Sequence, residues 1–240
     1  MSKKILITGA NRGLGFAFVK VSLDNGYTVL AGCRNPEKAE DLKQLRSEFT
    51  ERLHIINLDP TNINSIKQVV EYAKQHFGSL DILVNNAGMN SKSSGVDPSI
   101  HLQLGKFQAE PILNMFHLNA VAPLIMAQEF LDLLSKSQRG LIVNISSWFA
   151  SLSIPQKGNY SYSASKAALN MFNKVLANDL GKYGILTLAV NPGWMKTDMG
   201  GKSASLEPEE SAKSILEFSQ KLKMEDSGKF FNHDGSIHLW

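Results

Sequence analysis

The sequence has very little of what anchors or crosslinks many secreted and membrane proteins. Cys33 is the only cysteine among 240 residues, which excludes an internal disulfide framework and favours a reducing compartment. No apolar run approaches the roughly 18–20 residues that a membrane-spanning helix needs. The segment before Thr8 also holds too few apolar side chains for the core of a signal peptide. We therefore expect a cytoplasmic protein with no membrane partner.

Neither sign of charge dominates the sequence. Its 25 Lys and Arg residues are scattered among 22 Asp and Glu residues, and the tightest basic cluster is the pair Lys3 and Lys4. A nucleic-acid-binding protein more often has a basic stripe with stacking aromatic side chains. The histidines show no metal-ligand spacing. We therefore expect an ordinary solvated surface, no nucleic-acid partner and no metal.

What is present is a sequence of globular composition, with 43% hydrophobic and 20% charged residues. It has no repeat, no low-complexity stretch and no linker, which predicts a single domain over residues 1–240. Short apolar runs predict strands over 3–8, 27–32, 52–58, 80–86, 140–146 and 185–190, with a short one near 229–232. Amphipathic stretches predict helices from the first glycine-rich turn to Asn25 and over about 36–49, 63–77, 109–135, 160–181 and 207–222.

The alternation of strand and helix predicts an α/β fold, a doubly wound parallel (Rossmann) sheet in a three-layer domain. The two stretches expected to be irregular, 89–107 and 193–206, both follow the carboxyl ends of strands. Ligands of such folds bind at that edge of the sheet.

A glycine-rich turn directly follows the first predicted strand. Gly9, Gly13 and Gly15 are spaced as G-x-x-x-G-x-G, one residue longer than the usual dinucleotide fingerprint. The first would make the turn, the second would let the backbone approach a phosphate, and the third would permit close helix–strand packing. The helix that begins here would offer free N–H groups to a pyrophosphate, so we favour a dinucleotide site over a merely structural turn. The residues expected to contact the dinucleotide here are Gly9, Asn11, Arg12, Gly13, Leu14 and Gly15.

The end of the second strand indicates which dinucleotide binds. A site for NAD needs an acidic residue about 20 positions after the glycines to bind the ribose 2′-hydroxyl. Arg34 stands in that place, no acid follows it before Glu37, and Arg12 lies in the glycine-rich turn itself. Two guanidinium groups fit a 2′-phosphate, although two ordinary surface arginines remain the alternative. The sequence therefore predicts NADP(H) as the cofactor.

Tyr162 and Lys166 are four residues apart at the start of a predicted helix, so both lie on one face. A tyrosine with its ordinary pKa of about 10 is a poor acid at neutral pH, and a neighbouring ammonium lowers that pKa by stabilising the phenolate. Such a pair is often no more than a surface pair. Its place one strand after Ser146 and Ser147 favours a catalytic role.

Several motifs occur in a set order along the chain. They are Thr8-Gly9-x-x-x-Gly13-x-Gly15, Asn85-Asn86-Ala87-Gly88, Ser147, Tyr162-x-x-x-Lys166 and Pro192-Gly193. Together they resemble the short-chain dehydrogenase/reductase family over essentially the whole chain. The ending, from Gly228-Lys229-Phe230-Phe231 to Leu239-Trp240, resembles the carbonyl-reductase, sniffer and C-factor-like group of that family.

The resemblance implies a role for each catalytic candidate. Tyr162 would protonate the carbonyl oxygen as hydride reaches the carbon, and Lys166 would bind the nicotinamide ribose and lower the tyrosine pKa. Ser147 would hydrogen-bond the substrate oxygen. Asn119 would hold a relay water behind Lys166, unless it is a core or capping asparagine.

The resemblance also implies further contacts to the cofactor. Asp59 and Asn86 would line the adenine pocket, and Thr197 would bind the carboxamide. The remaining candidates for cofactor contact are Leu58, Ala87, Gly88, Pro192 and Gly193.

Two questions about the substrate side stay open. The interval from Ser147 to Tyr162 is two residues longer than the family's usual 13, so Ser146 remains an alternative to Ser147, which the family alignment favours. The two serines would point to opposite faces of a strand, so only one can serve. The residues that would rim an apolar cleft, unless they simply pack beneath the loops, are Trp148, Phe149, Trp194 and Met195.

These patterns predict an NADPH-dependent reductase that converts an apolar or aromatic aldehyde, ketone or quinone to the alcohol, with Tyr162 as proton donor. Two alternatives are an NADP-linked alcohol dehydrogenase that works oxidatively and a cofactor-sensing regulatory protein without turnover. The helix predicted over 160–181 carries more apolar surface than one side against the sheet requires. We therefore expect a homodimer or homotetramer with a two-fold interface.

Overall fold

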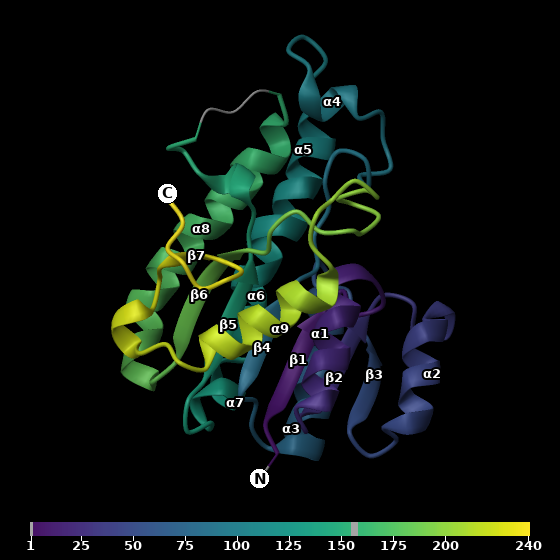
Figure 1. Ribbon diagram of the computed structural model, residues 1–240, viewed down its shortest axis with the longest axis vertical. Coiled ribbons are helices and arrows are strands. Elements are labelled where there is room, and N and C mark those ends of the chain that lie inside the picture. Colours follow the sequence, from purple (N-terminus) through teal and green to yellow (C-terminus); the bar gives the residue numbers. More distant parts are fainter. Residues whose placement is uncertain (1, 155–157) are drawn as a thin grey trace.

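One parallel sheet forms the centre of the protein (Figure 1). Within residues 2–154 and 158–240, which the computed structural model describes, the sheet has seven strands in the order β3-β2-β1-β4-β5-β6-β7. The strands are β1 (Lys4–Thr8), β2 (Thr28–Cys33), β3 (Leu53–Asn57), β4 (Ile82–Asn85), β5 (Leu141–Ile145), β6 (Leu186–Asn191) and β7 (Phe230–Asn232). All neighbouring strands run parallel, so their carboxyl ends meet at one edge.

The strands are apolar on both faces because helices cover the sheet from both sides. Ile5 and Ile7 belong to the hydrophobic cluster on one face, whereas Leu6 between them belongs to the cluster on the other. All three are fully buried. A strand in this position reads as a continuous hydrophobic run rather than as an alternating one.

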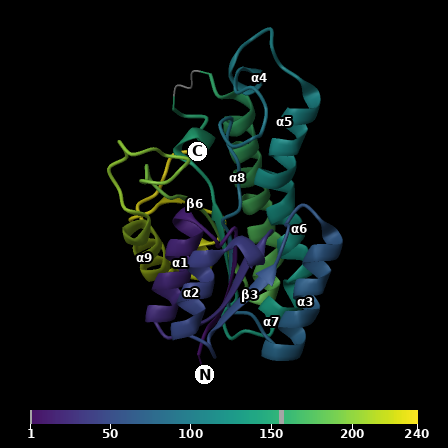
Figure 2. The same cartoon turned by 90° about the vertical axis from the view of Figure 1, so that its right-hand side faces the viewer.

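The helices form the two outer layers. Figure 2 shows the sheet between α1, α2 and α9 on one side and α3, α6 and α8 on the other. The helices are α1 (Gly13–Asp24), α2 (Glu40–Glu48), α3 (Ile63–Phe77), α4 (Ser99–Leu102), α5 (Ala109–Phe116), α6 (Ala122–Glu129), α7 (Leu131–Ser135), α8 (Tyr160–Leu180) and α9 (Pro208–Ser219). The predicted doubly wound α/β fold is confirmed. In the described part of the chain, every helix is too short or too polar to span a bilayer.

Three predicted segments differ from the observed ones. Residues 36–38 form a separate 3₁₀ turn before α2, so the helix predicted over 36–49 is shorter. The helix predicted over 109–135 is divided into α5, a π-helical turn over His117–Val121, α6 and α7. The loop 89–107, predicted to be irregular, contains the short helix α4.

Pro123 gives a physical reason for the π-helical turn. Proline has no backbone N–H and its ring collides with the carbonyl four residues earlier, so an α-helix cannot continue undistorted through it. In this chain that carbonyl belongs to Asn119, which lies within the turn. Wider turns of this kind occur often at functional sites.

Candidate active site

The glycine-rich turn between β1 and α1 lies at the carboxyl edge of the sheet, beside the loop that follows β4. Gly9 has a φ of +65° and Gly13 a φ of +54°, a backbone region that suits glycine. A Cβ on Gly15 would lie 2.2 Å from the backbone oxygen of Gly9, so only glycine fits there. The three glycines therefore have the conformational and packing reasons that their spacing predicts.

The first turn of α1 is free to bind an anion. The backbone N–H groups of Gly13, Leu14 and Gly15 have no acceptor among the described residues, as expected for the first turn of a helix. The side chain of Asn11 beside them is exposed. Free donors and the positive end of the helix dipole together suit a pyrophosphate. The residues present therefore fit a dinucleotide.

Asn86, from the loop after β4, holds the glycine-rich turn in place. Its Nδ2 donates to the backbone oxygens of Thr8 (2.9 Å) and Gly9 (3.2 Å). The backbone N–H groups of Asn86 and Ala87 both donate to Oγ1 of Thr8. The amide nitrogen predicted to line an adenine pocket is thus committed to the backbone of the turn.

The two arginines predicted to bind a 2′-phosphate differ in their surroundings. The Arg34 side chain is exposed and has no partner among the described residues, while its backbone oxygen accepts a hydrogen bond from Asn57. The guanidinium of Arg12 pairs with the carboxylate of Asp198 at 3.0 Å, and both side chains are more than half exposed. Of these two arginines, Arg34 is therefore the one without an ion pair among the described residues.

In the loop after β3, the groups available to a cofactor are the backbone and the Asp59 carboxylate, because the Leu58 side chain lies in the core. Oδ1 of Asp59 accepts hydrogen bonds from the backbone N–H and the hydroxyl of Thr61. Leu58 is 1% exposed, and its side chain fills the space that a Cβ on Gly32 would need. The Leu58 side chain belongs to the core, so only the backbone of Leu58 is left for the predicted cofactor contact.

Ser147 and Tyr162 come together at the carboxyl end of β5. Tyr162 lies in the first turn of α8 and forms a hydrogen bond with Ser147. Ser146 is 2% exposed and points instead to Asn170, with 2.6 Å between its Oγ and the amide oxygen. Of the two serines, Ser147 is therefore the one that meets Tyr162.

Burial, rather than Lys166, dominates the titration of the tyrosine. It raises the pKa of Tyr162, and the hydrogen bond with Ser147 opposes that rise. Lys166 is 4% exposed, and burial lowers its pKa to about 8. Its Nζ donates to the backbone oxygen of Ile145 at 2.7 Å and lies 6.0 Å from the centre of the Tyr162 ring. Burial and Ser147 are the influences that shift the Tyr162 pKa here, and the predicted lowering by Lys166 is not among them.

Asn119 connects the loop after β4 to α8. It is fully buried, its Oδ1 accepts from the N–H of Met89, and its Nδ2 donates to the Met89 oxygen and to Oγ of Ser165. Its side chain is therefore occupied by protein groups. Because Pro123 cannot donate a hydrogen bond, the backbone oxygen of Asn119 lacks the partner that it would have in an α-helix.

Gly88 lies between these groups. A Cβ placed on Gly88 would come within 3.2 Å of Oδ1 of Asn119 and 3.5 Å of Nζ of Lys166. A larger side chain would therefore crowd both of them.

The segment after β6 folds over the glycine-rich turn. Pro192 accepts a hydrogen bond from Ser211 of α9 at its backbone oxygen, and Gly193 follows with a φ of +82°. A Cβ placed on Gly13 would lie 3.4 Å from Cγ2 of Thr197. Thr197 thus stands above the predicted phosphate site.

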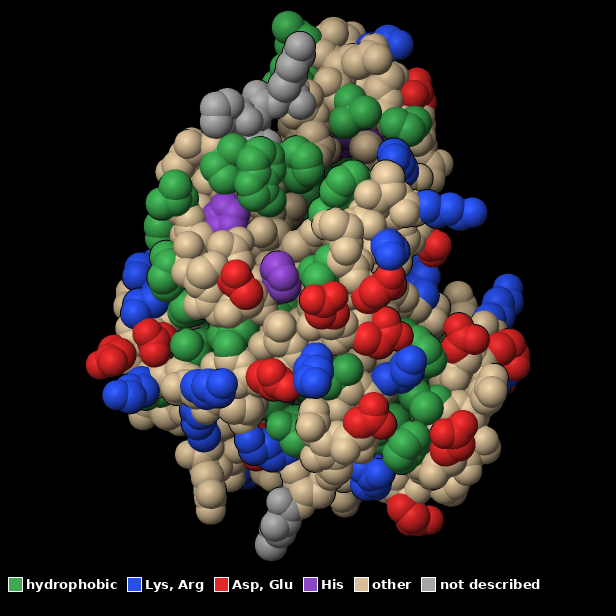
Figure 3. Space-filling model, in the orientation of Figure 1, with side chains coloured by type: hydrophobic (Ala, Val, Ile, Leu, Met, Phe, Trp, Pro, Cys, Tyr) green, Lys and Arg blue, Asp and Glu red, His purple; other side chains and the backbone are tan. Residues whose placement is uncertain are grey.

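Aromatic side chains lie near Tyr162. The rings of Trp148 and Phe149 are 5.4 Å apart, and the ring of Phe149 is 6.3 Å from that of Tyr162. Trp194 is exposed, and its indole N–H donates to the Gly200 oxygen. Hydrophobic side chains gather on the upper part of the face seen in Figure 3, where the chain ends. Met195, predicted to line the same cleft, is partly buried and packs against the hydrophobic core, so its role in lining the cleft stays a prediction.

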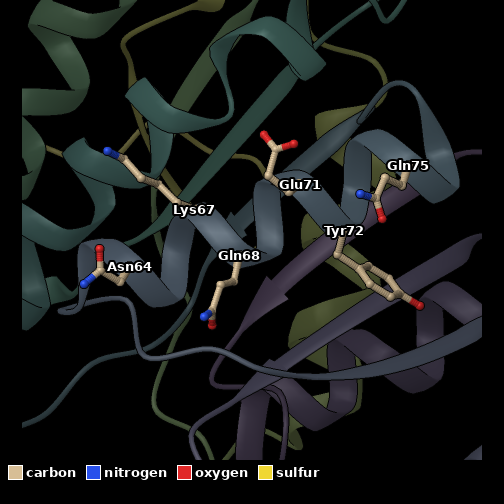
Figure 4. A pocket seen from close by; sticks show the side chains of 6 residues that line it. All are labelled: Asn64, Lys67, Gln68, Glu71, Tyr72 and Gln75. Atoms are coloured by element: carbon tan, nitrogen blue, oxygen red, sulfur yellow. The ribbon is translucent and has the colours of Figure 1, made fainter.

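Two hollows lie outside the cluster of Ser147, Tyr162 and Lys166, and the first shares Phe149 with the predicted substrate side. One, of about 370 Å³, is lined by residues 149–152 and by Gly158, Tyr160, Ser163, Ala164 and Ala167, on the side of α8 away from Lys166. The other is an open groove along α3 (Figure 4). Its lining residues are Asn64, Lys67, Gln68, Glu71, Tyr72 and Gln75. All six come from one helix, and neither hollow includes a catalytic candidate.

Sequence reasoning did not identify two neighbours of the site. Asn170 follows Lys166 by four residues, as Lys166 follows Tyr162, so the same helical spacing could have indicated it. Asp198 pairs with Arg12 across 186 residues of sequence, and only the fold brings the two together.

Comparison with known proteins agrees with this geometry. The family model described as short chain dehydrogenase matches residues 3–207. The chain is 36% identical over 226 residues to the short-chain dehydrogenase anuI of Penicillium roqueforti, covering 88% of this chain and 86% of that protein. It superposes on the NADPH-bound carbonyl reductase from chicken fatty liver with a TM-score of 0.90 and 32% identity, covering 100% and 99% of the two chains. The carbonyl reductase Sniffer of D. melanogaster gives a TM-score of 0.92 and 32% identity, with all of both chains covered. The family predicted from the motifs is confirmed, and this chain belongs to the short-chain dehydrogenase family.

Proposed function

We propose that this protein is an NADPH-dependent carbonyl reductase that converts an aldehyde, ketone or quinone to the alcohol. The observation that carries the proposal is the contact between Ser147 and Tyr162, with buried Lys166 one turn along the same helix. The likeness to NADPH-bound carbonyl reductase at 32% identity over the whole chain supports the same reaction.

The dinucleotide would lie across the carboxyl edge of the sheet. Its pyrophosphate would bind the free N–H groups of Gly13, Leu14 and Gly15, and its 2′-phosphate would bind Arg34. Arg12 would join Arg34 after leaving Asp198. Thr197 would bind the carboxamide. When bound, the reduced nicotinamide supplies the hydride.

Tyr162 would supply the proton. Because burial raises its pKa, the phenol is protonated at neutral pH and can donate to the oxygen of the carbonyl as negative charge develops there. Ser147 would orient that oxygen through a second hydrogen bond. A proton lost from Tyr162 would be replaced through Lys166, whose pKa of about 8 allows exchange near neutral pH, and through a water held by the backbone oxygen of Asn119.

The substrate would be apolar or aromatic. Phe149, with Trp148 against it, places an exposed ring beside Tyr162, and Trp194 is exposed on the segment after β6. Aromatic walls with a few polar groups are typical of pockets for such ligands. We also propose cytoplasmic action, on the basis of the lone Cys33, and a two-fold dimer through the outer face of α8, where Met171 and Val175 are exposed.

The test is Tyr162→Phe, assayed with NADPH and a panel of aldehydes, ketones and quinones. Loss of the phenol should lower kcat by about 100-fold or more and leave the Kd for NADPH nearly unchanged. Tyr160→Phe is the matched control, because Tyr160 lies on the same helix but packs against Phe107. Wild-type activity in Tyr162→Phe would refute the mechanism.

The same panel also separates the alternatives. A protein that binds NADPH but reduces none of the carbonyls and oxidises none of the corresponding alcohols would be a cofactor sensor. The intact Ser147, Tyr162 and Lys166 favour turnover, since a sensor needs only the dinucleotide site.

A further inference from the structure

Three consecutive residues at the end of β5 each hold one residue of α8. The backbone oxygen of Ile145 accepts from Lys166 at 2.7 Å, and Ser147 bonds to Tyr162. Between them, Oγ of Ser146 donates to Oδ1 of Asn170 at 2.6 Å. The three helix residues are spaced by four and so share one face. Two of these contacts belong to the proposed reaction, and the third has no role in it.

The contact between Ser146 and Asn170 is buried, and its serine is bonded to the sheet. Both residues are nearly fully buried, at 2% and 3% exposure. The backbone N–H of Ser146 donates to the Val190 oxygen of β6, so the serine is fixed to the sheet before its hydroxyl reaches the helix. Tyr162, in contrast, lies in the first turn of α8. The buried contact is thus suited to set the position of the helix along its axis.

We propose that Ser146 and Asn170 are positioning residues that hold α8 at the height at which Tyr162 meets Ser147. The inference rests on the proposed carbonyl reduction. Reacting groups must be held in close register, and a displacement of about 1 Å can cost about 100-fold in rate. With a rise of about 1.5 Å per residue, a slip of less than one residue along α8 would separate the phenol from Ser147.

Removal of the Ser146 hydroxyl would disturb Asn170 more than the loss of one bond suggests. Nδ2 of Asn170 is buried and has no partner among the described residues. Without Ser146, both polar atoms of the Asn170 amide would be unpaired, and a buried unpaired amide is unfavourable. The amide would then rotate or bind a water molecule, and α8 would lose the contact that fixes its position along its axis.

Thr187 of β6 offers a matched control, because its side chain bonds to the same helix. Its Oγ1 donates to Oδ1 of Asn173 at 2.6 Å, and both residues are fully buried. Thr187→Val therefore removes a bond of the same length and type, three residues farther from Tyr162 along α8, while Oδ1 of Asn173 keeps its hydrogen bond from Nδ2 of Asn144 at 3.0 Å. If α8 is only loosened in general, both substitutions should affect catalysis alike.

The experiment compares Ser146→Ala, Thr187→Val and the double variant Ser146→Ala/Asn170→Leu. We expect Ser146→Ala to lower kcat about tenfold or more with KM and the Kd for NADPH within about twofold, whereas Thr187→Val keeps kcat within about twofold. The double variant replaces both partners by apolar groups, which should recover stability. Its kcat should stay low, because the contact that fixes α8 is still missing.

A spectroscopic readout keeps this inference separate from the proposed function. The ζ-carbon resonance of ¹³C-labelled Tyr162, assigned with Tyr162→Phe, reports the contact with Ser147 without any turnover. It should shift in Ser146→Ala and not in Thr187→Val. An equal loss of kcat in Thr187→Val, recovery of kcat with stability in the double variant, or an unshifted Tyr162 resonance would each overturn the positioning role. Failure of wild type on every carbonyl would count against the proposed function instead.

Discussion

Lys166 provides a prediction in which removal of a buried charge stabilises the protein. It is 4% exposed, it has no carboxylate partner among the described residues, and burial lowers its pKa from 10.5 to about 8. Between these two pH values the unfolded chain binds a proton that the folded protein has lost, so the free energy of unfolding rises with pH across that window. Below pH 8 the full cost of burying the ammonium is present.

The size of the effect follows from the two pKa values. At about 1.4 kcal/mol per pH unit, the buried charge costs about 3 kcal/mol at pH 7. Lys166→Met removes the charge and keeps a long, flexible side chain. It also removes the hydrogen bond to Ile145, which is worth about 1 kcal/mol. We therefore expect Lys166→Met to be more stable than wild type by about 2 kcal/mol at pH 7.

The assay is urea unfolding followed by tryptophan fluorescence at pH 7 and 9.5, with one protein concentration throughout. At pH 9.5 the buried lysine of wild type is neutral, and the difference in unfolding free energy should shrink to about zero. Lys74→Met, at an exposed site paired with Glu71, should not show this pattern. A Lys166→Met protein that is less stable than wild type at both pH values by the same amount would refute the reasoning.

Three further predictions concern the cofactor and the assembly. Arg34→Ala should weaken NADPH binding by roughly ten- to a hundredfold and barely affect NADH, and Arg34→Asp should do more; an unchanged ratio of kcat/KM for the two cofactors would contradict this. Gly15→Ala should abolish dinucleotide binding in calorimetry because its Cβ would lie 2.2 Å from the Gly9 oxygen, whereas Gly181→Ala, with nothing within 4 Å, should bind normally. Light scattering at micromolar concentration should give at least twice the monomer mass of 26.4 kDa, and the monomer mass itself would exclude the dimer.

Much of the fold could be predicted from the sequence, because helix ends and turns depend on local residues. Helix α3 begins after Asn62, whose side chain caps two N–H groups, and ends before Gly78 with a φ of +70°, as the spacing of its apolar residues predicts. The glycine-rich turn has the positive φ values and close contacts that its spacing indicates. Such features depend on residues that are close in sequence.

The features that sequence reasoning missed depend on partners brought together by the fold. The direction of the Lys166 ammonium is set by the Ile145 carbonyl, and the buried surroundings of Tyr162 raise its pKa despite the nearby lysine. Arg12 meets Asp198 only because the segment after β6 folds back over α1. The packing of partly buried Met195 against the core could not be predicted from its position between an exposed tryptophan and a lysine.

Two backbone hydrogen bonds join the ends of a loop in the segment after β6. The N–H of Lys196 donates to the Leu206 oxygen at 2.9 Å, and the N–H of Leu206 donates to the Trp194 oxygen at 3.2 Å. Residues 197–205 therefore form a loop whose two ends are joined independently of the sheet. The entropic cost of closing a loop grows only slowly with its length. Protein engineering could therefore exchange or lengthen 198–205 while the strands beneath keep their places.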